Sequence, residues 1–188
     1  NSQGAATLTD SYATGNVTNT VTDTGGIIGK GTSVTLTNVY ATGTINGAAK
    51  TGGIFGGSDF GGTYTFTDCY STGAVSGTIQ IGGIVGYITR SVLNVRRSYA
   101  TGNVTGTSSQ VGGLVGVLYG DAPGQMPGYI GHSYSTGNVS GTHLVGGIFG
   151  YAEYGGGWGD PEGILPYISN SYAAGNVTAT AGAAGGLI

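Results

Sequence analysis

Apolar and polar positions along the chain follow one heptad that returns six times. SYATGNV occupies residues 11–17 and 98–104, and near-copies occupy residues 39–45, 69–75, 133–139 and 171–177. A second phrase, a glycine pair followed by two apolar residues, follows each heptad at a fixed distance. It begins at residues 25, 52, 82, 112, 146 and 185. All variation in repeat length therefore falls between this phrase and the next heptad.

A repeat of this size predicts a stacked β architecture. A unit of about 28–30 residues cannot bury a core alone, whereas stacked copies bury a continuous one. The prediction is a single all-β domain over residues 1–188, a β-solenoid (β-helix) of about six coils with glycine corners. Coils begin near residues 5, 33, 63, 92, 127 and 165, and longer insertions at 117–131 and 151–168 fall on one edge. A β-propeller, which uses about 40–50 residues per blade, fits poorly.

Alternation within the repeat predicts which side chains face the core. The position four before the heptad tyrosine is always apolar, and the position two before it is usually polar, which predicts a corner or bulge there. Small residues beside the tyrosine, the Val or Ile five positions after it, and pairs such as Ile84 and Val85 are expected inside. The glycine three positions after the tyrosine is expected to supply a backbone angle that a Cβ would forbid.

The same alternation places one tyrosine and one threonine of each coil outside, in two ladders. The inverted alternative, in which a bulge turns the tyrosines into the core, stays open. The predicted surface ladder comprises Tyr12, Tyr40, Tyr70, Tyr99, Tyr134 and Tyr172 with Thr14, Thr42, Thr72, Thr101 and Thr136.

Composition narrows the function classes. The chain has 42 glycines, four prolines, 7% charged residues and a net charge of −3, a composition typical of neither collagen nor a disordered chain. It has no basic cluster and no apolar run of about 18 residues, so we expect neither nucleic-acid binding nor a transmembrane helix. Cys69 is the only cysteine, which excludes an internal disulfide, and its place in the repeat predicts burial.

Few residues have the spacing of a chemical site. His132 and His143 lack partners at metal-ligand spacing, and calcium at Asp10 or Asp68 would lack the usual acidic loop, so we expect no metal, no cofactor and no catalytic residues. Asn-Val-Thr/Ser matches glycosylation acceptors at Asn16, Asn103, Asn138 and Asn176, although it belongs to the repeat itself.

One insertion combines aromatic rings with carboxylates, which suits carbohydrate binding; the alternative is an apolar lid over the solenoid. This candidate binding loop comprises Tyr151, Glu153, Tyr154, Trp158, Asp160 and Glu162.

The tandem pattern S-Y-[AS]-T-G-N-V followed by G-G-[IL]-[VIF]-G resembles the GLUG repeat over essentially the whole chain, from about Ala5 to Ile188. That repeat recurs in large secreted and surface proteins of bacteria and some archaea, including adhesin-like proteins and non-catalytic regions of IgA-specific metallopeptidases. The resemblance implies an extracellular, non-enzymatic, repetitive β-structure. It implies no particular ligand.

These features together favour an extracellular structural protein that forms a stalk, fibre or sheath unit of a cell surface. The first and last repeats lack polar caps, which indicates either head-to-tail self-association into filaments or an array cut from a longer protein. The alternative is an adhesin or carbohydrate-binding module that uses the Tyr/Thr face or the Trp158 loop. Ice binding through the threonine ladder is a third hypothesis, and an enzyme is the least expected.

Overall fold

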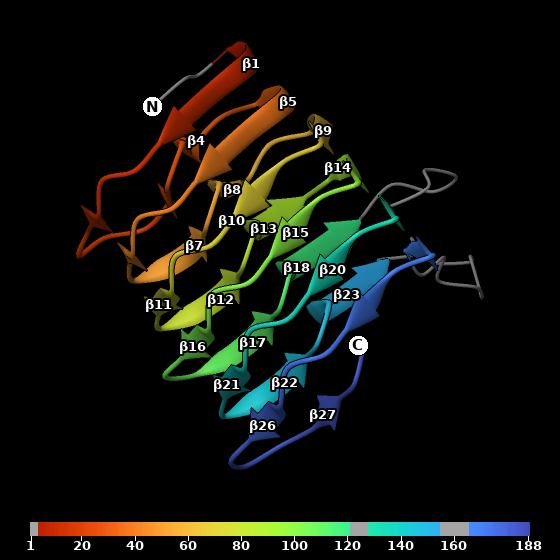
Figure 1. Ribbon diagram of the computed structural model, residues 1–188. Coiled ribbons are helices and arrows are strands. Elements are labelled where there is room, and N and C mark those ends of the chain that lie inside the picture. Colours follow the sequence, from red (N-terminus) through yellow and green to blue (C-terminus); the bar gives the residue numbers. More distant parts are fainter. Residues whose placement is uncertain (1–3, 121–127, 155–165) are drawn as a thin grey trace.

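The computed structural model describes residues 4–120, 128–154 and 166–188, and it is a β-solenoid. The described residues form 27 short strands and no helix, and every strand pairing is parallel (Figure 1). In each turn the chain passes through four sheets, here named A to D. The predicted all-β solenoid is confirmed, with about five turns. A sixth level is present in sheets A, B and C but not among the described strands of sheet D.

Sheet A is the largest sheet and contains ten strands. Its first two levels are single long strands, β1 (Ala5–Ala13) and β5 (Ser33–Ala41). Each later level has two short strands: β9 (Gly62–Thr67) and β10 (Tyr70–Ser71), β14 (Ser91–Arg96) and β15 (Tyr99–Ala100), β19 (Gly128–Gly131) and β20 (Tyr134–Ser135), and β24 (Tyr167–Ser169) and β25 (Tyr172–Ala173).

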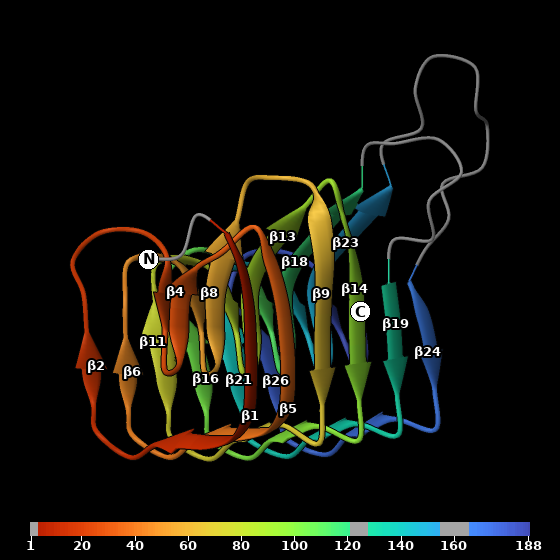
Figure 2. The ribbon, with the colours of Figure 1, turned by 90° about the horizontal axis from the view of Figure 1, so that it is seen from above.

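Sheets B, C and D complete each turn with one short strand apiece (Figure 2). Sheet B contains β2 (Val17–Thr18), β6 (Ile45–Asn46), β11 (Val75–Gly77), β16 (Val104–Gly106), β21 (Val139–Gly141) and β26 (Val177–Ala179). Sheet C contains β3 (Thr24–Gly25), β7 (Ala49–Gly52), β12 (Ile79–Gly82), β17 (Ser109–Gly112), β22 (His143–Gly146) and β27 (Ala184–Gly185). Sheet D contains β4 (Ile28–Lys30), β8 (Phe55–Ser58), β13 (Val85–Thr89), β18 (Val115–Gly120) and β23 (Phe149–Tyr154).

The register aligns equivalent repeat positions in neighbouring coils. Tyr40, for example, pairs with Tyr12 on one side and with Tyr70 on the other. The heptad is therefore a unit of construction, since each copy supplies one level of sheets A and B.

The interior contains two apolar columns separated by a narrow waist. The larger column lies between sheets A and D and includes fully buried Phe55, Phe66 and Ile84, while the smaller lies between sheets B and C and includes Ile45 and Val111. Burial of one such side chain stabilises the fold by roughly 1.5–3 kcal/mol. At the waist, the second glycine of every pair but the last meets the small residue after a heptad tyrosine. A Cβ on Gly83 would lie only 2.5 Å from the Cβ of Ala100.

The predicted polar corner is present in every coil, before the heptad tyrosine. Its residues have left-handed φ angles of 46–55°, and they are Asp10, Asn38, Asp68, Arg97, His132 and Asn170. Asp and Asn tolerate this conformation better than most residues. A second left-handed corner, which the repeat pattern did not predict, lies in sheet C at Asp23, Lys50, Gln80, Gln110 and Leu144, with φ of 52–65°.

The predicted reason for the heptad glycine is wrong. None of these glycines has φ in the left-handed region. Instead, a Cβ on Gly73 would lie 2.5 Å from the carbonyl carbon of Gly43 in the preceding coil, and still closer to its oxygen. Gly137 faces Gly102 in the same way. The glycine is required because neighbouring coils approach closely at this point.

The two long insertions leave and rejoin the solenoid at neighbouring positions. Gly120 and Tyr154, the last described residues before them, are paired between β18 and β23. Tyr129 and Tyr167, shortly after them, are paired between β19 and β24. The insertions therefore start from one edge, between sheets D and A, while residues 121–127 and 155–165 lie outside the described residues.

Candidate functional site

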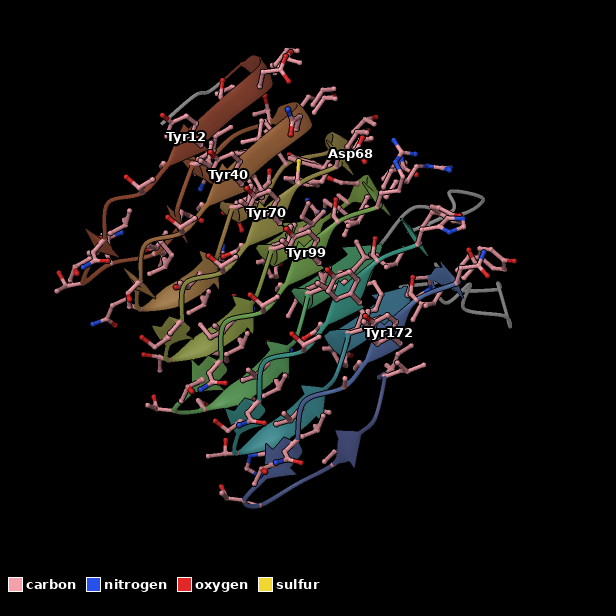
Figure 3. The ribbon with its side chains drawn as sticks, viewed as in Figure 1. Tyr12, Tyr40, Asp68, Tyr70, Tyr99 and Tyr172 are labelled. Atoms are coloured by element: carbon pink, nitrogen blue, oxygen red, sulfur yellow. The ribbon has the colours of Figure 1, made fainter. Side chains whose placement is uncertain are left out.

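The heptad tyrosines form one continuous stack along the outer side of sheet A (Figure 3). Successive ring centroids are 4.6–5.1 Å apart, and successive ring planes differ by 1–5°. Tyr12 and Tyr172, at the two ends, are 64% and 52% exposed, and the four between them are partly exposed. The inverted alternative, with tyrosines in the core, is wrong.

This stack leaves little ring surface for a ligand. Each inner ring has a neighbouring ring on both faces, so a ligand on this side would meet ring edges and hydroxyl groups. Sugars bind aromatic residues mainly through the ring face, which is open only at the outer sides of Tyr12 and Tyr172. Burial, and then the neighbouring phenols, raise the pKa of Tyr40 and Tyr99. The geometry therefore suits stabilisation of the coil stack.

The threonine and asparagine columns lie beside the tyrosine stack. Thr14, Thr42, Thr72, Thr101 and Thr136 are all exposed. The side chain of Asn138 accepts a hydrogen bond of 3.0 Å from the backbone N–H of Asn176 in the next coil, and Asn103 binds Asn138 in the same way. Asn16 accepts from the N–H of Thr44 at 2.9 Å. These asparagines of the Asn-Val-Thr/Ser pattern thus link neighbouring coils.

Charged side chains from sheets C and D gather beside the outside of sheet D, in a chain with only five basic and eight acidic residues. Lys30 binds Asp59 at 3.0 Å and Asp23 at 3.5 Å, and Lys50 also binds Asp59. Burial favours the neutral acid of Asp59, but the two lysines outweigh it and lower the pKa of Asp59. The ammonium of Lys50 also lies 4.7 Å from the ring centre of Tyr87, a cation–π contact.

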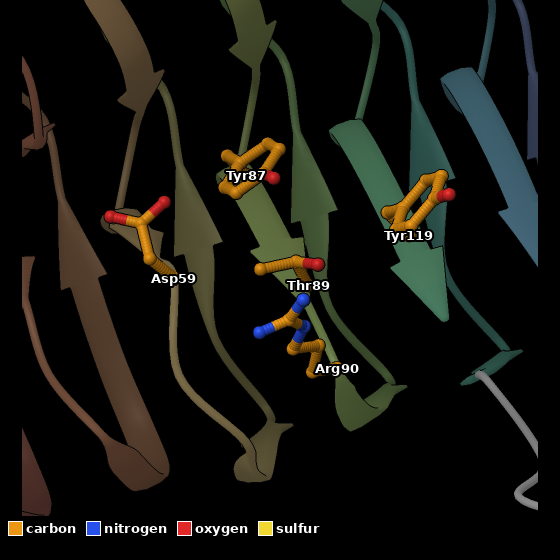
Figure 4. A pocket seen from close by; sticks show the side chains of 5 residues that line it. All are labelled: Asp59, Tyr87, Thr89, Arg90 and Tyr119. Atoms are coloured by element: carbon orange, nitrogen blue, oxygen red, sulfur yellow. The ribbon is translucent and has the colours of Figure 1, made fainter. Parts of the chain in front are cut away.

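A pocket opens beside this charged cluster (Figure 4). Its volume is about 360 Å³, and its lining residues are Asp59, Tyr87, Thr89, Arg90 and Tyr119. They come from three successive coils: Asp59 follows β8, Tyr87 and Thr89 belong to β13, Arg90 follows β13, and Tyr119 belongs to β18. Thr89 pairs with Tyr119 across the two strands.

The predicted binding loop begins next to this pocket. Tyr151 pairs with Val117 and Glu153 pairs with Tyr119, so both lie on the coil beyond the pocket. The hydroxyl of Tyr151 donates a hydrogen bond to the Glu153 carboxylate, which is the main reason that the pKa of Tyr151 rises to about 12. The backbone of Tyr154 ends β23, whereas Trp158, Asp160 and Glu162 lie outside the described residues.

The sequence did contain a signal for the residues that the repeat analysis missed. Gly57, Tyr87, Val117 and Tyr151 occupy one row of sheet D in successive coils. The residue type changes at every level of this row, whereas it is constant in the tyrosine stack. Tyr87 and Tyr151 are partly exposed in this row, whereas Gly57 and Val117 are buried, so the variation decides at which levels a ring lies on the outside.

The structure places the remaining candidates as follows. Asp68 accepts two hydrogen bonds from Arg97, at 2.7 and 2.9 Å, which lower the pKa of Asp68. Asp10 accepts one from Asn38 at 2.6 Å. Cys69 is fully buried, as expected, and burial raises the pKa of its thiol to about 11. His143 is exposed in β22.

Metal sites and membrane-spanning helices are both absent from the described ranges 4–120, 128–154 and 166–188. Within these ranges, no group of three or more His, Cys, Asp or Glu side chains is placed to hold a metal ion. No helix there is long and apolar enough to cross a membrane.

In comparisons with known protein families, curated proteins and solved structures, nothing matches the chain.

Proposed function

We propose that this domain is a rigid structural module of an extracellular surface protein, used as a stalk, fibre or sheath unit. The observation that supports the proposal best is the in-register pairing of every coil with the next through the sheets that they share. The resemblance of the repeats to GLUG repeats supports the extracellular location. In this role the outer faces of the sheets form the exposed surface of the module, and the two buried apolar columns hold the coils together.

The rigidity has an identifiable physical source. Backbone hydrogen bonds join neighbouring coils even at the corners, for example from the N–H of Tyr99 to Cys69 at 3.0 Å and from Thr101 to Ser71 at 3.0 Å. Inside, buried serine hydroxyls continue this pattern, since Ser98 Oγ accepts from the N–H of Cys69 at 3.0 Å. All these bonds are made within the polypeptide, so the proposed module keeps its shape without a bound ligand.

Electron microscopy and surface labelling test the proposal together. We expect the purified protein to form uniform, rigid particles whose thermal unfolding midpoint does not change with EDTA. Antibodies against the protein should label intact, unpermeabilised cells of the source organism. Flexible, heterogeneous particles, or a protein found only after the cells are permeabilised, would contradict the proposal.

Self-association belongs to the same proposal. The two end coils expose apolar side chains, with Val21 63% exposed in the first coil and Ile188 49% exposed in the last. Head-to-tail stacking of two copies would pair the open strand edges of these two coils. Sedimentation velocity over a concentration series should show a mass that rises with concentration, and a constant monomer mass would remove self-association from the proposal.

Carbohydrate binding is the second candidate function, and the structure favours a different location for it than the sequence did. The stacked tyrosines offer mainly ring edges, whereas the outside of sheet D combines separated rings with polar groups in a pocket.

A further inference from the structure

We propose that the pocket on sheet D binds a neutral carbohydrate, with Tyr87 and Tyr119 as the aromatic contacts and Asp59, Thr89 and Arg90 as the polar ones. This site differs from the Tyr/Thr face and from the Trp158 loop. It adds to the structural role, and each of the two proposals can fail without the other.

The arrangement of the rings is the first reason. Tyr87 pairs with Gly57 in one neighbouring coil and with Val117 in the other, and Tyr119 pairs with Thr89 and Glu153. Neither tyrosine therefore has a ring next to it in its own row, and among the described residues no ring–ring contact involves them. Both side chains are partly exposed. They thus avoid the face-to-face stacking that covers the heptad tyrosines. The Lys50 ammonium covers one face of Tyr87, so Tyr87 would meet the C–H groups of a sugar with its other face, and Tyr119 is the more open ring.

The polar groups around these rings are the second reason. A sugar presents many hydroxyl groups, each of which both donates and accepts hydrogen bonds. The pocket supplies an acceptor in the Asp59 carboxylate, a donor in the Arg90 guanidinium, and a hydroxyl group in Thr89. Lys30 of the preceding coil and Lys50 of the same coil each bind one oxygen of the Asp59 carboxylate and fix its position beside the pocket.

The charge balance indicates a neutral ligand. Among the described residues, the charged side chains in and beside the pocket are three cations, Lys30, Lys50 and Arg90, and three anions, Asp23, Asp59 and Glu153. These six charges cancel, so the described part of the face attracts neither acidic nor basic ligands over long distances. The pocket volume of about 360 Å³ lies at the small end of the range for ligand sites, roughly 300–1,000 Å³. The site is therefore sized for a short stretch of a glycan.

Immobilised polysaccharides test the proposal with the whole chain. The probes are neutral glucan, mannan and galactan, with polygalacturonate and hyaluronate as acidic comparisons, and binding is measured by biolayer interferometry. We expect binding to at least one neutral polysaccharide that changes little between 50 and 500 mM salt. Binding to none of the neutral probes, or to the acidic ones alone, would overturn the proposal.

Variants of the pocket show whether this binding uses sheet D. Tyr119→Ala and Tyr87→Ala should each weaken it by about tenfold or more, because aromatic anchors carry most of the energy at such sites. Tyr119→Phe, which keeps the ring, should retain most of the binding and remains informative if Tyr119→Ala does not fold. Tyr12→Ala is the matched control, an exposed tyrosine on another face, and should bind like the unaltered protein.

Two further outcomes would contradict the site. Binding that Trp158→Ala abolishes while both sheet D alanine variants retain it would assign the ligand to the insertion. Binding that Tyr12→Ala weakens as strongly as Tyr119→Ala would assign it to the tyrosine stack. In both cases the circular dichroism spectra of the variants must match that of the parent protein, so that a loss of structure is not mistaken for a loss of the site.

Discussion

Replacement of the heptad glycine by alanine should be costly inside the solenoid and harmless in its first coil. In Gly73→Ala, the new Cβ would lie 2.5 Å from the carbonyl carbon of Gly43, where carbon atoms normally stay about 3.5–4.0 Å apart. In Gly15→Ala, the Cβ would meet no atom within 4 Å, because no coil precedes this one among the described residues. The two glycines occupy the same position of the heptad and differ in this contact.

The expected free energies have opposite signs. Relief of the overlap at Gly73 requires two backbone segments to separate, and overpacking of this kind costs about 1–3 kcal/mol or more. That is a large part of a typical unfolding free energy of about 5–15 kcal/mol. Gly15→Ala should instead stabilise the protein by about 0.4–1 kcal/mol, because alanine restricts the unfolded chain.

Denaturant unfolding measures both changes. Circular dichroism and tyrosine fluorescence should be followed together, because repeat proteins can lose end coils before the centre. Thr72→Ala, at an exposed position of the same coil as Gly73, is the control for general sensitivity of that coil and should change little. Equal destabilisation by Gly15→Ala and Gly73→Ala would refute the packing explanation. It would indicate instead that this heptad position needs a backbone angle that a Cβ forbids.

Three further results are expected. The pKa values of Tyr40 and Tyr99 are raised in the folded protein, so their contribution to stability is complete below the ordinary tyrosine pKa of about 10 and is lost as the pH rises above it. The melting temperature should therefore fall above that pH, and it should fall less in a Tyr40→Phe/Tyr99→Phe variant. An equal fall in both proteins would contradict this. Cys69, with its buried thiol of pKa about 11, should react with iodoacetamide only after denaturation, and fast labelling of the folded protein would show that this part of the core opens. Arg97→Ala should leave the unfolding midpoint in physiological salt unchanged, because the ion pair with Asp68 is exposed; a clear drop would give this pair a structural role.

The repeat predicted the fold because it constrains every level at once. Three features recur in all six copies: an apolar residue four positions before the tyrosine, a polar corner two positions before it, and small residues on either side of it. A stack of coils accommodates these features in all six copies together. The outward position of the tyrosines follows from the alternation of inward and outward side chains along a strand, provided that this alternation starts anew after the polar corner. The structure adds the reason that the rings stack: equivalent residues pair directly from coil to coil.

Other features depend on distances between coils, which no single repeat contains. The role of the heptad glycine arises from the carbonyl group of the preceding coil. The left-handed corner at Lys50 and Gln80 uses residues that rarely adopt this conformation. The pocket is made by Asp59, Tyr87 and Tyr119, which lie at positions where the copies differ. The features that the repeats share therefore do not indicate them.

Hydrogen exchange of the backbone amides tests most directly the central claim, that the domain is a rigid solenoid without any bound ligand. In EDTA, the N–H groups of Tyr99 and Thr101, which bond to the preceding coil, should exchange only through global unfolding and should be among the slowest in the chain. Amides of the first and last coils should exchange faster. Exchange of the central heptad amides at the rate of an unstructured peptide would contradict the rigid solenoid and the structural function proposed from it.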